Sequence, residues 1–254
     1  MWTDTHLHLD ASEYDSDRLA VVQRARELHV TRFVLPAVGA FNFDEVKSLA
    51  HSIPGAVYCL GIHPMFVDKA KEEDLLTLKQ KIQTSIDDSK FAGLGEIGLD
   101  GFVPGLNWDK QVQFFHAQLK LARDFDVPVV MHVRKAQDSV LKGLRIYKPR
   151  SGIAHAFNGS FQQADHFLNL NMCLGFGGAS TFTRALQLPE SAMVLETDGP
   201  DIAPEWINKQ RNAPEHLPRI AETIAELRQS SVEVLSRQTQ LNAQRVLPAL
   251  ALQG

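Results

Sequence analysis

The sequence has little cysteine and no long apolar run. It holds only 2 cysteines in 254 residues, which excludes a disulfide-stapled fold. Cys59 and Cys173 both lie inside apolar runs, so we expect two buried free thiols in a reducing compartment rather than a disulfide between them. No run approaches the roughly 20 apolar residues that span a bilayer, and the N-terminus lacks the basic start and apolar core of a signal peptide. The sequence therefore predicts a cytoplasmic protein without a membrane partner.

An excess of positive charge is also lacking. The formal net charge is −4, which argues against tight nonspecific binding to duplex nucleic acid, because such binding requires Lys and Arg to neutralise phosphates. A phosphate substrate is still compatible with this charge, since divalent ions held by a few carboxylates leave a local positive focus. The content of 44% hydrophobic and 22% charged residues is that of an ordinary globular protein. We expect one domain over residues 1–254 and see no sign of an obligatory protein partner.

Short apolar runs alternate with helical patterns along the chain, which is typical of repeated strand–helix units and a parallel sheet. The eight predicted strands cover residues 2–9, 32–36, 56–61, 91–95, 127–132, 152–155, 172–175 and 192–196. Eight units predict an α/β fold, a (β/α)8 TIM-type barrel.

Apolar residues at helical spacing predict helices over residues 15–28, 109–125, 215–227 and 232–247. The stripes expected to face the sheet are, in the first two helices, Leu19, Val22, Ala25 and Leu28, and Val112, Phe115, Leu119 and Ala122. The last two helices are expected to cover the final turn of the barrel and its base.

Residues of metal-ligand type follow the apolar runs. His6 and His8 would point to the same face of a strand, although an isolated His-x-His is more often a pair of surface or core histidines. Five further residues end later runs: His63, Glu96, His132, His155 and Asp198. Because the carboxyl ends of barrel strands converge on one rim, this recurrence predicts a coordination shell there.

Six motifs resemble those of the TatD-type metal-dependent deoxyribonucleases, within the wider amidohydrolase-like barrel group. They are Asp4-Thr5-His6-Leu7-His8, Leu60-Gly61-Ile62-His63-Pro64, Gly95-Glu96-Ile97-Gly98-Leu99-Asp100, Met131-His132-Val133-Arg134, His155-Ala156-Phe157-Asn158-Gly159-Ser160 and Leu195-Glu196-Thr197-Asp198-Gly199-Pro200. The likeness covers nearly the whole chain.

The resemblance implies two metal sites that share one ligand. One ion would be held by His6, His8, Glu96 and Asp198, and the second by Glu96, His132 and His155. The chain departs from the commonest family wording at Ala156, Asn158, Gly199 and residues 101–103. None of these departures touches an implied ligand, so they bear on substrate choice rather than on metal binding.

Imidazole nitrogens and carboxylate oxygens suit divalent ions such as zinc, manganese or magnesium. A carboxylate that bridges two ions about 3.5 to 4 Å apart is how two-metal hydrolases clamp the attacking and leaving oxygens. Glu96 can bridge with its two oxygens, and Asp198 would bind a metal and accept a proton from the attacking water.

Other residues are candidates for substrate contacts. His63 is placed to hydrogen-bond a phosphate oxygen or to protonate a leaving group, or else it caps the loop stiffened by Pro64. Arg134 and Arg211 can grip phosphate with planar donor forks. Lys135 and Lys209 can add charge, although surface cations are solvated by default.

Three further sets of residues have two possible roles each. Asp4 and Asp100 either fix histidine tautomers or cap loops, and the glycines of 175–178 either admit phosphate or form a turn. Four aromatic residues either stack a nucleobase or only pack: Trp108, Trp206, Phe102 and Phe157.

We therefore predict a metal-dependent phosphodiesterase, a deoxyribonuclease that acts on DNA ends, short oligonucleotides or another small phosphoester. The alternative is a related barrel hydrolase of an amide, lactone or aminoacyl ester, where the bridge is often a carboxylated lysine; this chain has Glu96 at that place. A non-catalytic metal-binding protein is disfavoured, because structural metal sites are closed and rich in cysteine.

Overall fold

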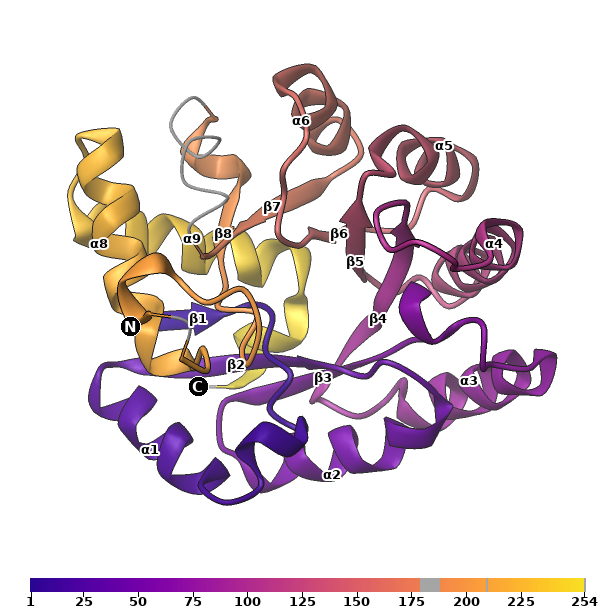
Figure 1. Ribbon diagram of the computed structural model, residues 1–254, viewed down its shortest axis with the longest axis horizontal. Coiled ribbons are helices and arrows are strands. Elements are labelled where there is room, and N and C mark those ends of the chain that lie inside the picture. The colour runs from indigo at the N-terminus through magenta and orange to yellow at the C-terminus, as the bar shows by residue number, and fades with distance from the viewer. Residues whose placement is uncertain (179–187, 209, 254) are drawn as a thin grey trace.

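The strands form a nearly closed parallel barrel with helices around it (Figure 1), as the sequence predicts. The computed structural model describes residues 1–178, 188–208 and 210–253. Each strand pairs with the next in chain order: β1 (Trp2–Asp4), β2 (Val30–Pro36), β3 (Ala56–Leu60), β4 (Phe91–Asp100), β5 (Val129–Arg134), β6 (Gly152–Ala154), β7 (Met172–Phe176) and β8 (Met193–Leu195).

Helices follow most of the strands and cover the outside of the barrel. They are α1 (Arg18–Glu27), α2 (Phe43–Ser52), α3 (Glu72–Ser85), α4 (Trp108–Asp124), α5 (Gln137–Tyr147), α6 (Phe161–Leu168), α8 (Leu217–Arg228) and α9 (Val232–Val246). None of the described helices is long and apolar enough to cross a bilayer.

The barrel closes through hydrogen bonds at and just beyond the carboxyl ends of β1 and β8. The Thr5 backbone nitrogen donates to the Leu195 carbonyl at 3.0 Å, and the Asp198 nitrogen donates to the His6 carbonyl at 2.9 Å. These bonds hold the first and last segments that carry predicted metal ligands side by side.

Two strand boundaries differ from the prediction in ways that matter for the site. β1 ends at Asp4 rather than at residue 9, so His6 and His8 lie in a loop and are not placed by strand alternation. β4 continues to Asp100 instead of ending at residue 95, so Glu96 lies inside a strand and not at its end. The extra length of β4 pairs with β5, where Gly98 is opposite His132 and Asp100 is opposite Arg134.

The helix stripe prediction was right for Val22 and Ala25 but wrong for Leu19 and Leu28 in the first helix, and it was largely right for α4. Leu19 is 74% exposed and Leu28 is 49% exposed, because the buried side of α1 is formed by Val21, Val22 and Ala25. In α4 three of the predicted core residues are buried, namely Phe115, Leu119 and Ala122. The fourth, Val112, is partly buried.

The end of the barrel opposite the rim that carries the predicted ligands is apolar and is covered by the C-terminal segment. Strand residues from β2 to β8 form one buried cluster with the end of α9 and the following turn η7 (Pro248–Gln253): Val34, Val57, Cys59, Ala92, Val130, Ile153, Cys173, Val194, Ala243, Val246, Leu247, Ala249 and Leu250. Both cysteines are free and buried, as predicted. This packing closes the base, so polar chemistry is confined to the opposite rim.

Candidate metal centre

The centre of the site is the Glu96 carboxylate, which is 1% exposed in the barrel interior. The backbone nitrogen of Glu96 donates to the Ala37 carbonyl at 2.8 Å, which ties this part of β4 to the end of β2. Each of the two carboxylate oxygens faces a different set of imidazoles.

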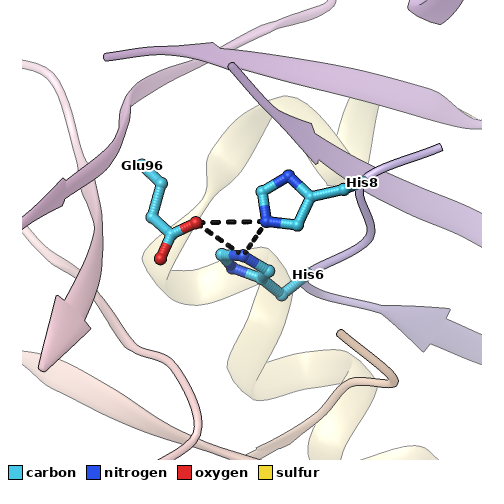
Figure 2. Close-up of side chains that lie close together, drawn as sticks. All are labelled: His6, His8 and Glu96. Carbon is cyan, nitrogen blue, oxygen red and sulfur yellow. Dashed lines mark hydrogen bonds and ion pairs between the residues drawn. The ribbon is translucent and has the colours of Figure 1, made fainter. Parts of the chain in front are cut away.

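The first set of ligand atoms surrounds Glu96 Oε2 (Figure 2). His6 Nε2 lies 3.1 Å and His8 Nε2 lies 3.2 Å from this oxygen, and the two nitrogens are 3.2 Å apart. Asp198 Oδ1 is 3.5 Å from His6 Nε2 and 3.8 Å from His8 Nε2. Asp198 has a left-handed backbone with φ 57°, which the hydrogen bond to the His6 carbonyl maintains.

The second set surrounds Glu96 Oε1. His155 Nε2 lies 2.9 Å and His132 Nδ1 lies 3.0 Å from this oxygen, and the two nitrogens are 3.4 Å apart. These predicted ligands come from consecutive strands that are neighbours in the barrel, because His132 is on β5 and His155 follows β6.

Both sets fit divalent metal ions. Metal–ligand distances of about 2.0 to 2.1 Å place the ligand atoms of a tetrahedral site about 3.3 Å apart, close to the separations seen here. In the first set, three lone-pair atoms of His6, His8 and Glu96 converge on one point, and a cation satisfies them better than hydrogen bonds between them. The residues thus form groups that can hold metal.

The electrostatics of the cluster also favour bound positive charge. Burial alone would raise the pKa of Glu96, but the surrounding imidazoles, chiefly His63, His6 and His155, hold it well below its usual range. Burial opposes protonation of His8, yet its hydrogen bond to Glu96 and the charge of Glu96 raise its pKa to about 9. Glu96 thus remains a carboxylate that attracts cations.

Asp198 is less firmly ionised in the metal-free protein. Burial raises its pKa to about 6, against the opposing effects of His155 and His8. A neighbouring cation favours the ionised form of a carboxyl group, so metal binding and ionisation of Asp198 support each other.

The His63 ring also belongs to the cluster, and each of its two nitrogens has a different partner. Its Nδ1 accepts the Met65 backbone N–H at 3.1 Å and so caps the turn η3 (Pro64–Phe66). Its Nε2 lies 3.1 Å from Glu96 Oε1. Because Nδ1 accepts, Nε2 carries the proton of the neutral ring and is a donor rather than a metal ligand. Burial lowers the pKa of His63 to about 4, which keeps the ring neutral.

Asp100 is placed to orient one of the histidines. Its Oδ2 lies 2.9 Å from His132 Nε2, while its Oδ1 accepts the backbone N–H groups of Phe102 and Val103. A carboxylate on Nε2 fixes the tautomer in which Nδ1 is free to bind a metal. The tautomer-fixing alternative is therefore the one that the geometry of Asp100 favours.

Asp4 does not have this role. Its carboxylate accepts the backbone N–H groups of His6 and Thr197 and the Thr197 hydroxyl, and within the described part of the chain it forms no hydrogen bond with an imidazole. Burial raises its pKa to about 7. Asp4 therefore ties together the two loops that carry the first set of ligands.

Glu196 is a buried carboxylate that the sequence interpretation missed. Its Oε1 accepts the Ala156 N–H at 2.5 Å and lies 3.7 Å from His155 Nδ1, while its Oε2 has no hydrogen-bond partner among the described residues. A Cβ at Gly175 would lie 2.1 Å from Glu196 Oε2, so glycine there makes room for this side chain. In the sequence, Glu196 was marked only by its position between a strand and Asp198. Many residues with a purely structural role occupy such positions.

Arg134 and Lys135 lie at the rim near the second set. The Arg134 guanidinium is 3.9 Å from the Phe102 ring centroid and the Lys135 ammonium is 4.7 Å from it. Both are exposed, and Arg134 pairs in register with Asp100, whose side chain contacts His132. Exposed cations at this rim can meet an anionic substrate.

Arg211 is not brought to the cluster. Its guanidinium forms a two-pronged pair with the Asp17 carboxylate, both contacts at 2.8 Å, and lies over the Tyr14 ring. A fork occupied by a carboxylate cannot also grip phosphate, so the predicted substrate contact has no support from the geometry. Lys209 lies outside the described residues.

Among the predicted base-stacking aromatics, Phe157 is excluded by burial. It is 2% exposed and packs against Phe167 and Phe176. Phe102 is 48% exposed and Trp108 is 38% exposed. The Arg219 guanidinium lies over the Trp206 ring.

Comparison with known proteins identifies relatives along nearly the full chain. Residues 3–248 match the model of the family described as TatD related DNase. A protein of Escherichia coli K12 named "uncharacterized metal-dependent hydrolase YjjV" is 34% identical, with 92% of this chain and 93% of the relative covered. A protein of Erwinia billingiae named "3'-5' ssDNA/RNA exonuclease TatD" is 30% identical over 97% of this chain and 99% of its own.

A solved structure agrees with these relatives. The crystal structure of the Escherichia coli TatD homologue YjjV superposes with a TM-score of 0.92 at 32% identity, covering 97% of this chain and 98% of that one.

Proposed function

The chain belongs to the TatD-related DNase family and is a metal-dependent hydrolase, and we propose that residues 1–254 form one domain that removes nucleotides from the ends of single-stranded DNA or RNA. The substrate in this proposal is the one named for relatives such as the Erwinia billingiae exonuclease. The observation that carries it is the division of the Glu96 oxygens between two sets of imidazoles.

We propose that the site holds two divalent ions, of zinc, manganese or magnesium, with Glu96 shared between them. His6, His8 and Asp198 would complete one site, and His132 and His155 the other. Bound divalent ions would lower the pKa of water and stabilise negative charge on a phosphate.

The protein's own groups then have separate tasks. Asp198 accepts the proton of the attacking water, since its carboxylate borders the first set. His63 donates a hydrogen bond from Nε2 to a phosphate oxygen. Its neutral imidazole is held in place by the hydrogen bond that Nδ1 accepts. Arg134 binds a phosphate of the substrate at the rim with its planar fork.

Metal counting tests the two-site arrangement. The double variant His132→Ala, His155→Ala is expected to bind about half as much metal as the wild type, because it removes both imidazoles of the second set and leaves His6 and His8 intact. Metal content is measured by atomic emission after dialysis against buffered metal. His166→Ala, on α6, is the matched control, and full metal retention by the double variant contradicts the two-site proposal.

Product analysis tests the substrate. Metal-loaded protein is incubated with a single-stranded oligonucleotide labelled at either end, and stepwise shortening with release of mononucleotides is expected. The end that shortens gives the polarity. If the protein releases acid from an amide or lactone and leaves every phosphodiester intact, the related-hydrolase alternative is correct instead.

Replacing His63 separates a substrate contact from a metal contact. His63→Ala is expected to keep wild-type metal content but to lose about 10²-fold in kcat, the usual cost of removing one positioned donor to a developing anion. His63→Asn tests whether an amide donor restores part of the rate. Loss of metal in His63→Ala would instead make His63 a ligand.

A further inference from the structure

A pocket lies beside His63 that the metal centre does not use. It has a volume of about 240 Å³ and is formed by the loop after β2, the loop after β3 and the first turn of α3; its lining residues include Gly39, Phe41, Ile62, Phe66, Lys69 and Asp74. Both loops follow the carboxyl ends of their strands, so the pocket opens on the same rim as the metal centre.

The pocket is connected to the catalytic cluster through aromatic rings. The Phe41 and Phe66 ring centroids are 5.5 Å apart, and the Phe66 ring lies 6.2 Å from the His63 ring in an edge-to-face arrangement. His63 itself lies 3.1 Å from Glu96. A ligand in the pocket therefore lies next to the place where the phosphate is proposed to react.

Phe41 is unusual because its ring is 72% exposed although its loop is firmly held. It lies on the turn η2 (Ala40–Asn42), where the buried Asn42 side chain accepts the backbone N–H groups of Val38 and Gly39 and donates to Asp10 at 2.9 Å. An exposed ring on a fixed turn offers an apolar face without a large ordering cost on binding.

Gly39 allows the ring to lie flat against the loop. A Cβ at this position would be 2.6 Å from the Phe41 ring, so any side chain at position 39 would displace it. The Gly39 backbone is extended, with φ −174°, so close approach of the ring and not backbone conformation explains the glycine.

The chemistry of the pocket suits a planar heteroaromatic group. Two aromatic rings and the small apolar residues provide stacking surface, while the exposed Lys69 and the half-buried Asp74 place charges of opposite sign in the lining. The volume is below that of pockets for drug-sized ligands, which is about 300 to 1,000 Å³, and suits a single base.

We propose that this pocket binds a nucleobase of the single strand, next to the phosphate being cleaved, by stacking on the Phe41 ring with the tilted Phe66 ring beside it. The inference rests on the proposed nuclease function and adds a base subsite to it. Because every base has an aromatic face, such a subsite binds all four bases and favours unpaired strands.

Kinetics with variants of Phe41 test the subsite. Phe41→Ala is expected to raise KM for a single-stranded oligonucleotide by about 5- to 150-fold, the equivalent of the 1 to 3 kcal/mol typical of one stacked base. Metal content and kcat should stay close to wild type. Phe41→Leu keeps an apolar side chain without an aromatic face and should show most of the loss, while Leu19→Ala, an equally exposed apolar change on α1, should show none.

Abasic substrates distinguish stacking from a general loss. The abasic site is moved in steps from the cleaved end of the oligonucleotide. At one position, removal of the base should lower the affinity of the wild type, whereas Phe41→Ala should bind the abasic and the intact oligonucleotide equally. If Phe41→Ala weakens every abasic substrate as much as the intact one, or weakens none, the base subsite is wrong.

A binding measurement is independent of turnover. In the metal-loaded Asp198→Asn protein, an oligonucleotide with 2-aminopurine at that position should lose fluorescence on binding, and the loss should disappear with Phe41→Leu. Hydrolysis of oligonucleotides by wild type without any Phe41 effect overturns only the subsite. Absence of both hydrolysis and binding by wild type overturns the nuclease proposal, and the subsite falls with it.

Discussion

Replacing Glu96 by Gln is expected to reduce phosphodiester hydrolysis by about 10⁴-fold, at the upper end of the loss for one acid–base group. The reason for the size is that one carboxylate serves both sets of ligands, with Oε2 facing His6 and His8 and Oε1 facing His132 and His155. An amide has no negative charge and only one oxygen, so it cannot bridge two cations.

The Glu96→Gln variant should bind less metal at both proposed sites rather than at only one of them. The variant is measured by metal analysis and by single-strand hydrolysis at saturating metal, with Glu222→Gln as a matched control because Glu222 is exposed on α8. Circular dichroism checks that the barrel has folded. Wild-type turnover in folded Glu96→Gln would remove Glu96 from the mechanism.

Asp198→Asn is expected to lower kcat by about 10² to 10⁴-fold, the typical contribution of a positioned base. The amide keeps the size of the side chain and can still contact a metal through its oxygen, but it cannot accept a proton from water. The backbone nitrogen of residue 198 still donates to the His6 carbonyl, so the loop geometry should be retained.

The readout for Asp198→Asn is a large fall in kcat with little change in KM and with at least one ion still bound. Asp165→Asn, an exposed change on α6, is the control. Loss of all metal in Asp198→Asn would show that the carboxylate acts mainly as a ligand, and an unchanged rate would exclude its role as base.

Sequence reasoning worked well where periodicity carries the information. Buried parallel strands are short continuous apolar runs, and their alternation with helices restricted the fold to a barrel. The order of the predicted ligand residues after those runs also predicted that they lie on one rim. α4 has a long, regular stripe and its core residues were found, whereas the shorter α1 buries Val21 in place of Leu19.

The sequence by itself determined the barrel, its order of strands and the residue types of the metal centre, because these depend on local hydrophobic pattern and on the convergence of parallel strands. The tertiary structure decided how individual atoms are used. Only packing shows that Glu96 divides its oxygens, that Asp17 occupies Arg211 and that Glu196 lies beneath His155. The Phe41 pocket is likewise formed by two loops that meet only in the folded barrel, because contacts between distant segments leave no periodic trace in the chain.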